Sequence, residues 1–179
     1  MSRAAKKTFF GMVLAGLFLL PFFSWLAAEP VPYREPDGLF TIVPPNGWKN
    51  DDSGHMGKGV VMKGPAGESG IEPVVHLIYE PAGIVTIDVM WHTRLGQIRY
   101  DLQRVKFISL EDHEDASPPY SQARYSYRDQ DRTYLADVRL VMHEKSFFFM
   151  TAVAPEEEFE TNSPIFKAVF DSFLPGGGG

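Results

Sequence analysis

The sequence predicts an α+β domain in which helices cover an antiparallel sheet of about six to seven strands. Residues 147–154 place apolar side chains on both sides of an extended chain, which is typical of a strand covered on both faces. Residues 122–128 and 133–142 alternate apolar and polar side chains, and the turns between these segments are short enough for hairpins. Two further segments, 86–105 and 164–173, repeat apolar residues at helical spacing. We therefore expect helices to pack against an antiparallel meander whose last strand is central.

The length and composition fit a single domain. The 179 residues, 44% of them hydrophobic, suffice for a real core. Cysteine is absent, which excludes disulfides, thiolate metal sites and a thiol nucleophile. The formal charge is −6 and becomes −9 if residues 1–28 are removed, because 14 basic side chains then face 23 acidic ones. A body with this charge is a poor match for a phosphate backbone, so no nucleic-acid partner is expected.

The first 28 residues have the form of an export signal. A basic start precedes an apolar run from Phe9 to Phe23, and the small residues Ala27 and Ala28 follow. We expect cleavage after Ala28. Alternatively, residues 8–28 are long enough to span a bilayer uncut and to tether the protein to the inner membrane. In both cases the basic start predicts that the body is exported to a periplasmic or other extracytoplasmic location.

The folded domain is expected to occupy residues 37–174. The preceding residues 29–36 are rich in proline and are interpreted as an extended linker, and the last residues, 175–179, as a flexible glycine tail. The first predicted strand, Leu39–Val43, ends in a Pro-Pro-Asn-Gly turn. After this turn, Trp48 is expected to fold back onto the core.

Two short strands are predicted at residues 60–62 and 73–79, on either side of the loop Gly64–Gly70. This loop lacks the Lys-Ser/Thr pair of a phosphate-binding loop, and it precedes a strand where a phosphate site needs a helix N-terminus. We interpret it as the tip of a hairpin.

The segment from Thr86 to Val105 is predicted to be an amphipathic helix. Gly96 interrupts it at a cost of about 1 kcal/mol relative to alanine, which suggests close packing against a neighbour. The alternative is that Val85–Met90 continues a strand and that the helix starts near Thr93. The helical interpretation rests on the longer periodic run of apolar side chains, which comprises Ile87, Trp91, Leu95, Ile98, Leu102 and Val105.

A second amphipathic helix is predicted at the end of the domain. Pro155 has no N–H to donate and ends the central strand, and Ser163-Pro164 is typical of an N-cap followed by the first helical residue. The helix that starts there is expected to lie with one apolar face on the sheet. That face comprises Ile165, Phe166, Val169, Phe170 and Phe173.

The strongest candidate for chemistry is an acidic segment that follows a short predicted strand, Phe107–Leu110. We interpret this segment, Glu111–Asp115, as an exposed loop. One imidazole with two carboxylates suits Zn²⁺ or Mn²⁺, and hard carboxylate oxygens suit Ca²⁺. A solvated charged loop explains the same residues equally well. The candidate metal ligands are Asp112, His113, Glu114 and Asp115.

Other polar candidates are weaker. Asp51, Asp52 and His55 form a looser group in a glycine-containing loop, where a fixed coordination geometry is hard to maintain. His76, in an apolar strand, is expected to be a hydrogen-bonded histidine of the sheet, and His92 is expected to face solvent from a helix. No motif of a serine hydrolase or a metalloprotease is present, so no catalytic residue is predicted.

The meander carries two kinds of side chain that could contact a partner. Its polar face is a candidate docking surface on which charged residues are expected to pair across strands, namely Arg124, Arg128, Asp137 and Arg139. The tyrosines are expected to cover the sheet rather than to line a ligand surface, and these are Tyr100, Tyr125, Tyr127 and Tyr134.

Two stretches of the sequence resemble the PsbP-like superfamily. One is Leu39–Trp48, a strand that runs into a Pro-Gly-Trp turn, and the other is the ending, which comprises Ala152–Pro155, Phe159, Phe166 and Phe170–Phe173. The order of strands and the mid-chain helix are also similar, so the resemblance covers most of residues 37–174. It implies an α/β/α sandwich of a typically non-catalytic kind, whose members bind or steady membrane-associated assemblies and in some cases bind a divalent metal. The matching positions are turn and core residues, which identify a fold more than an activity.

The sequence therefore predicts an exported, non-enzymatic PsbP-like domain that acts as a binding or stabilising subunit for a membrane protein or membrane-associated complex. No cofactor is expected for this role. The first alternative is a divalent-metal-binding protein or metal-dependent hydrolase that uses the His113 segment. The second is a carrier of a lipid or small ligand, which requires an apolar pocket between a helix and the sheet.

Overall fold

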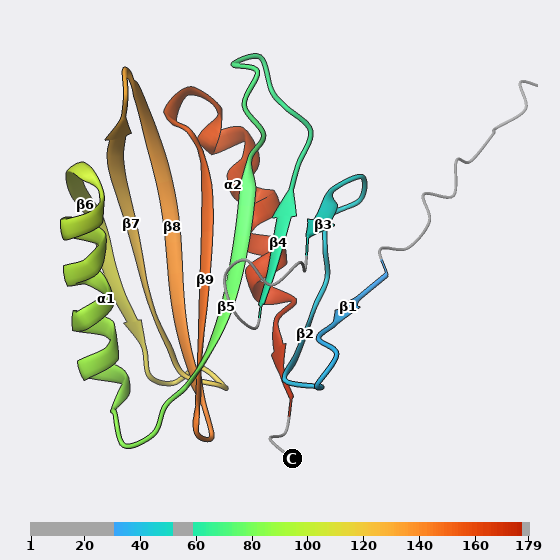
Figure 1. The fold of residues 1–179 in the computed structure, drawn as a ribbon, viewed down its shortest axis with the longest axis vertical. Helices are drawn as coiled ribbons and strands as arrows, with labels where there is room; N and C mark the ends of the chain where they lie inside the picture. Colours follow the sequence, from blue (N-terminus) through green and yellow to red (C-terminus); the bar gives the residue numbers. More distant parts are fainter. Residues whose placement is uncertain (1–30, 52–58, 177–179) are drawn as a thin grey trace, which may run out of the picture.

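The computed structural model describes residues 31–51 and 59–176 of the chain. Within these residues, ten strands form two antiparallel sheets, and two helices cover opposite faces of the larger sheet (Figure 1). The α+β class and the antiparallel sheet flanked by helices are thereby confirmed. Neither helix of this described part is long and apolar enough to cross a membrane. The predicted signal or anchor, residues 1–28, lies outside the described residues.

The larger sheet, here called the main sheet, contains seven of the described strands. Each strand is antiparallel to its neighbours. The strand predicted to be central lies in the middle, and the three strands of the predicted meander are adjacent. In order across the sheet, the strands are β3 (Lys49–Asp51), β4 (Gly59–Lys63), β5 (Val74–Pro81), β9 (Ser146–Pro155), β8 (Arg132–His143), β7 (Tyr120–Asp129) and β6 (Gln103–His113).

The core lies on both faces of β9. Phe148 and Met150 belong to an apolar cluster under helix α2 (Glu156–Asp171), whereas Phe147 and Phe149 belong to a second cluster under helix α1 (Ile87–Asp101). Each of these side chains is at most 3% exposed, and burial of one such group stabilises the fold by about 1.5–3 kcal/mol. The prediction of a strand covered on both faces is confirmed.

A small sheet is formed by β1 (Tyr33–Arg34), β2 (Phe40–Ile42) and β10 (Leu174–Pro175), with β2 in the middle. β1 lies in the segment expected to be a linker, and β10 includes the first residue of the expected tail. Both strands pair with β2 because its two backbone edges are otherwise open. The ordered backbone pairing therefore extends on both sides of the expected domain, residues 37–174.

Helix α1 begins where the sequence indicates but ends earlier. Thr86 caps the helix by accepting a backbone hydrogen bond from its first turn, so the alternative start near Thr93 is wrong. The prediction that the helix continues to Val105 is also wrong, because Asp101 is its last residue and β6 follows almost directly. Val105 packs against the α1 cluster from the strand instead. The pairing of Gln103 and Lys106 with β7, on either side of Val105, outweighs the helical spacing that this residue happens to match.

Helix α2 begins before the predicted N-cap, Ser163. Its first turn is Glu156–Glu158, and these carboxylates are favourable beside the positive end of the helix dipole. Pro164 is therefore an interior residue of the helix, although it cannot donate a hydrogen bond to the preceding turn. The earlier start also places Phe159 on the inner face of the helix, where it is completely buried. Burial of this ring stabilises the additional helical residues.

Two expectations about single residues have different outcomes. The ring of Trp48 packs edge-on against Phe166 of α2, with 6.3 Å between ring centroids, which confirms that it folds back onto the core. Gly96 does not mark close packing, because a Cβ atom added there would have no neighbour within 4 Å.

Candidate functional site

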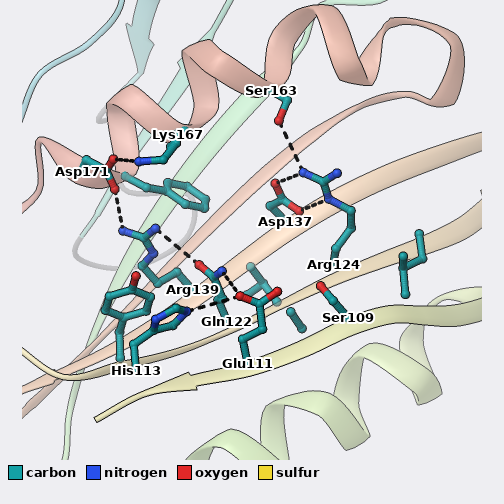
Figure 2. Close-up of a pocket in the computed structure, with 15 residues that line it drawn as sticks. Ser109, Glu111, His113, Gln122, Arg124, Asp137, Arg139, Ser163, Lys167 and Asp171 are labelled. Atoms are coloured by element: carbon teal, nitrogen blue, oxygen red, sulfur yellow. Dashed lines mark hydrogen bonds and ion pairs between the residues drawn. The ribbon is translucent and has the colours of Figure 1, made fainter. Parts of the chain in front are cut away.

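A cavity of about 540 Å³ lies between α2 and the strands β6, β7 and β8. Figure 2 shows that polar and charged side chains from all four elements meet around it. Helix α2 packs mainly on β9 and β8, and the same face of the main sheet continues past the helix across β7 and β6. The sheet face changes from apolar to polar at the border of the helix. We call this space the polar cavity.

Strand pairing determines which side chains meet in the polar cavity, because directly opposed residues lie on the same face of a sheet. Arg124 on β7 is opposite Asp137 on β8, and Gln122 is opposite Arg139. Glu111 on β6 is in turn opposite Gln122. Three strands therefore present one continuous polar surface to α2.

A chain of hydrogen bonds crosses the cavity from β6 to α2 (Figure 2). Gln122 donates from Nε2 to Oε2 of Glu111 at 3.0 Å, and its Oε1 accepts from Arg139 at 3.4 Å. Arg139 also donates to Oδ1 of Asp171 on α2 at 3.2 Å, and the other oxygen of that carboxylate accepts from Lys167. These contacts tie the last turn of the helix to the edge strand.

Arg139 is the most deeply buried cation of the cavity, with 9% of the residue exposed. Its guanidinium carbon lies 4.2 Å from the ring centroid of Tyr120 and 5.3 Å from that of Phe170, so both rings contribute cation–π attraction. Among the described residues, its Nε has no hydrogen-bond partner. A buried donor without a partner costs about 1–3 kcal/mol, so an acceptor that reached it would bind favourably.

The carboxylate of Asp171 is held in its charged form. Partial burial works to raise its pKa, but the hydrogen bonds from Lys167 and Arg139, together with their charges, lower the pKa below the ordinary value for aspartate. This group therefore contributes stability that is complete above the ordinary pKa of about 3.9 and is lost only as the pH falls through the lower value of the folded state. The link between α2 and β8 persists at neutral and mildly acidic pH.

A second charged cluster lies beside the middle of α2. Arg124 donates from Nε and Nη2 to the two oxygens of Asp137 at 2.7 and 2.9 Å, and its Nη1 lies 3.2 Å from Glu160. The hydrogen bond to Asp137 raises the pKa of Arg124, although partial burial opposes this. The predicted cross-strand pair is confirmed. Its surroundings are not as expected, because the guanidinium lies over the ring of Phe159, and α2 covers part of a face predicted to be open.

The segment around His113, predicted to be a loop, is the end of β6. Its pairing with β7 continues past Leu110 to His113, so consecutive side chains point to opposite faces. Glu111 and His113 line the polar cavity, where Nε2 of His113 lies 3.4 Å from Oε2 of Glu111 without forming a hydrogen bond. Asp112 lies on the other face and accepts a hydrogen bond from Ser121 at 2.6 Å.

The four predicted metal ligands are therefore not brought together. Glu114 and Asp115 lie in the turn after β6. Across residues 31–51 and 59–176, no group of three or more His, Asp and Glu side chains is arranged to hold a metal ion. In the weaker group, Asp51 ends β3, and Asp52 and His55 lie outside the described residues.

The two isolated histidines differ from each other. Nε2 of His76 is buried without a hydrogen-bond partner in the described part of the chain, so the expected hydrogen bond at this atom is not formed. Burial, and to a lesser degree the charge of Arg94, lower the pKa of His76. His92 is exposed as predicted, and its Nδ1 lies 2.8 Å from the carbonyl oxygen of Asp88.

Three of the four tyrosines cover the sheet, as predicted. Tyr125 and Tyr127 pack in the cluster under α1, and Tyr134 stacks on Tyr127 with 5.3 Å between ring centroids. Burial raises the pKa of Tyr127 to about 12. Tyr100 differs from these, since it projects from α1 with 91% of its surface exposed.

Several residues of the polar cavity are missed by sequence reasoning. Gln122 belongs to the alternating segment 122–128, Ser163 is the predicted N-cap, and Lys167 and Asp171 fall between the apolar residues of the second predicted helix. Nothing in the pattern indicates that these four residues meet. The available signal was the polar face of residues 122–128, which the structure shows to continue under α2. Arg128, expected to pair across strands, pairs instead with Asp131 in the adjacent turn, at 3.6 Å.

The polar cavity has the chemistry of a site that can bind polar groups. Its two arginines are each paired with a carboxylate, so the charges of the site are balanced. Ser109 and Ser163 line the cavity, but in the described residues neither is hydrogen-bonded to His113, as a serine nucleophile activated by a histidine would be. The arrangement offers preoriented donors and acceptors to a polar group that enters it.

No model of a known protein family matches the sequence, and no curated protein sequence matches it. Solved structures match over most of the chain. Cyanobacterial PsbP (CyanoP) from Synechocystis is 16% identical, with 88% of this chain and 98% of that chain covered and a TM-score of 0.61. LpqN of Mycobacterium tuberculosis, described as involved in cell envelope biogenesis, is 14% identical, with 83% and 91% covered and a TM-score of 0.62.

A third similar structure is PA94 from Pseudomonas aeruginosa, described as a protein of unknown function. It is 12% identical, with 83% of this chain and 99% of that chain covered and a TM-score of 0.61. Similarity at these identities concerns the fold and not the residues of the polar cavity. The neighbours are nevertheless matched over almost their whole length. The chain therefore has the PsbP-like fold that the resemblance of its sequence implied.

Proposed function

We propose that this protein is an exported, non-enzymatic accessory domain that binds a partner protein at the cell envelope and receives part of that partner in the polar cavity. The main support for the proposal is the environment of Arg139. Its side chain is buried between two rings and held by Gln122 and Asp171, yet Nε lacks a partner in the described residues. A preoriented arginine with one unsatisfied N–H donor suits recognition of an acceptor, and arginine is enriched among the residues that dominate binding energy at interfaces.

The proposed location has two independent supports. Residues 1–28 have the basic start and apolar run of an export signal. A structure with the same fold, LpqN, is described as involved in cell envelope biogenesis. A partner in or at a membrane would be reached by a protein exported with this signal.

The surroundings of the cavity indicate the chemistry of the partner segment. β6 is an edge strand of the main sheet, and Ile108, which is 58% exposed, lines the cavity from it. A fitting segment therefore carries an amide or carboxylate acceptor for Arg139 and an apolar side chain that covers Ile108. Such a segment would contact all three strands.

The proposal is tested by affinity purification from solubilised membranes of the source cell. Ser109 lines the cavity, so Ser109→Trp should fill the space without removing any of its charged groups. The matched control is Tyr100→Trp, which adds the same side chain at an exposed position of α1. We expect one membrane protein to be recovered with the wild-type chain and the control, and to be lost with Ser109→Trp. Equal recovery with both variants, or no specific protein with any form, contradicts the proposal.

The second candidate is the binding of a small polar ligand in the same cavity. The volume of about 540 Å³ falls in the usual range of small-molecule sites. The lining is charged, so the ligand would be zwitterionic or carry a carboxylate, whereas the carrier expected from the sequence requires an apolar pocket. Mass spectrometry of the protein purified from its native host would detect a retained ligand.

A further inference from the structure

A second cavity, of about 450 Å³, lies on the other side of α2 and is apolar. We call it the α2 groove. Its walls are Val43–Pro45 on one side and Pro164, Ile165, Ala168 and Val169 of the helix on the other. The one hydroxyl in the lining belongs to Ser172, which donates to the carbonyl of Val169 at 2.7 Å and accepts from the N–H of Val43 at 2.9 Å. This hydroxyl is thus already hydrogen-bonded inside the protein.

The apolar character continues beyond the groove. Leu174 of β10 is opposite Thr41 of β2, and Thr41 and Val43 point to the same side of an extended chain. Leu174 therefore lies on the sheet face that leads into the groove, and 64% of it is exposed. Ile165 is exposed as well, at 36%.

Charge is distributed unevenly along α2. The first half of the helix carries four glutamates, Glu156, Glu157, Glu158 and Glu160. In the second half the one acid is Asp171, whose carboxylate is bonded by Lys167 and Arg139. The part of the helix that forms the groove therefore presents no uncompensated carboxylate. Placing this part of the helix against an apolar surface would cost little free energy of desolvation.

The chain enters the described domain at the rim of the α2 groove. Tyr33, the first residue of β1, is opposite Ile42 of β2, and Ile42 directly precedes Val43, which lines the groove. Val31 is itself 82% exposed. Three residue steps separate Val31 from Ala28, the last residue of the apolar stretch, and they span at most about 11 Å. If residues 8–28 lie in a bilayer, the groove must lie close to its surface.

We propose that the alternative to cleavage after Ala28 applies, because an apolar groove lies where the chain enters the domain: residues 8–28 remain attached as a membrane anchor, and the α2 groove, with Leu174 and Val31, lies against the lipid bilayer. The occupant of the groove is thus the membrane surface itself. In this orientation the polar cavity, on the other side of α2, faces the aqueous compartment and stays accessible to a partner. The inference rests on the proposed envelope location and adds which face of the domain contacts the membrane.

The absence of cysteine allows a direct test, because a single introduced cysteine can carry an environment-sensitive fluorophore. The full chain with Ile165→Cys is labelled and reconstituted into vesicles of phosphatidylethanolamine and phosphatidylglycerol, with and without a lipid that carries a quencher in its acyl chain. The controls are Glu157→Cys, in the first turn of the same helix, and Tyr100→Cys, on α1. All three positions are solvent-accessible in the described domain, and circular dichroism of each labelled protein verifies that the fold is retained.

We expect the label at Ile165 to shift its emission to the blue and to be quenched severalfold more by the modified lipid than the labels at Glu157 and Tyr100. If the protein floats with the vesicles but the label at Ile165 has the same emission and the same lipid quenching as the control labels, the inference is overturned and the proposed function is unaffected. A label that is shielded but not quenched by the lipid shows that a second copy occupies the groove, which also overturns it. Protein that fails to float with the vesicles disproves the anchor and with it the inference, whereas the Ser109→Trp experiment tests the partner-binding function independently.

Discussion

Arg139 on β8 and Asp171 in the last turn of α2 are joined by a hydrogen bond of 3.2 Å, although 32 residues separate them in the sequence. Asp171 lies next to Ser172, which lines the α2 groove, while Arg139 lines the polar cavity. The bond therefore fixes the helix between the polar cavity on one side and the apolar α2 groove on the other. It also gives the polar cavity a fixed wall.

Replacement of Arg139 by methionine should lower the free energy of unfolding by about 1–3 kcal/mol, because Asp171 and Gln122 lose a buried donor. The effect stays below that of a fully buried pair, since the side chain of Asp171 is 44% exposed and can be rehydrated. Urea denaturation of the two proteins measures the difference. The matched control is Lys167→Met, which removes the other donor to Asp171 at a side chain that is 74% exposed, and should cost under about 1 kcal/mol. Equal losses would show that burial of Arg139 has no energetic consequence.

Stability should decrease when the pH falls below about 6.5, in part because of His76. Its pKa is lowered in the folded state, so below the ordinary pKa the unfolded chain binds a proton that the folded chain does not. The stability from this group is complete above that pH and is lost as the pH falls toward the folded value. Urea denaturation at about pH 7.5 and 5.5 measures the change, and His76→Gln should show a smaller decrease than the wild type. An identical pH dependence of the two proteins would contradict the assignment.

Two glycine substitutions should have opposite effects. Gly96 lies in α1 with open space around it, so Gly96→Ala should stabilise the protein by about 0.5–1 kcal/mol through helix propensity. At Gly64, an added Cβ would lie 2.7 Å from the ring of Trp48 and 2.8 Å from Pro73, so Gly64→Ala should destabilise by about 1–3 kcal/mol. Thermal melts compare the two variants with the wild type. A higher melting temperature for Gly64→Ala would show that Trp48 does not pack as described.

The placement of Asp112 makes a specific prediction about metals. Because its side chain lies on the other face of β6 from His113, the four candidate ligands should not form one site for Zn²⁺, Mn²⁺ or Ca²⁺. Calorimetric titration of the full chain with each ion measures this. If the wild-type chain binds an ion stoichiometrically, we expect at least one of the variants His113→Ala and Asp112→Ala to bind it as well as the wild type. Loss of binding in both variants would mean that the end of β6 rearranges around a metal.

The meander of β7, β8 and β9 could be predicted from the sequence because each strand carries its own evidence, an alternation or a two-sided apolar run, and each turn is short. The limits of the two helices could not. Val105 fits the spacing of α1, but it lies in β6, whose residues Gln103 and Lys106 pair with β7 on either side of it, and that partner strand is not visible in a local pattern. Ser163-Pro164 has the form of a helix start, whereas the burial of Phe159 extends α2 to Glu156.

The candidate site was less predictable than the fold. Pairing of Arg124 with Asp137 follows from two adjacent antiparallel strands and was expected. The contact of Arg139 with Asp171 depends on the angle at which α2 crosses the sheet, which results from packing of the core and not from the residues themselves. The His113 segment was assigned to a loop because its charges resemble those of loops, although the backbone pairing of β6 reaches that far.

Site-specific photo-crosslinking in intact cells can show whether the polar cavity receives a partner protein. A photoreactive amino acid is placed at Ser109, which lines the cavity, and in a control protein at Tyr100 on the outer side of α1. We expect one discrete crosslinked product with a membrane protein from Ser109 and none from Tyr100. The same product from both positions, or no product from Ser109, would contradict this expectation.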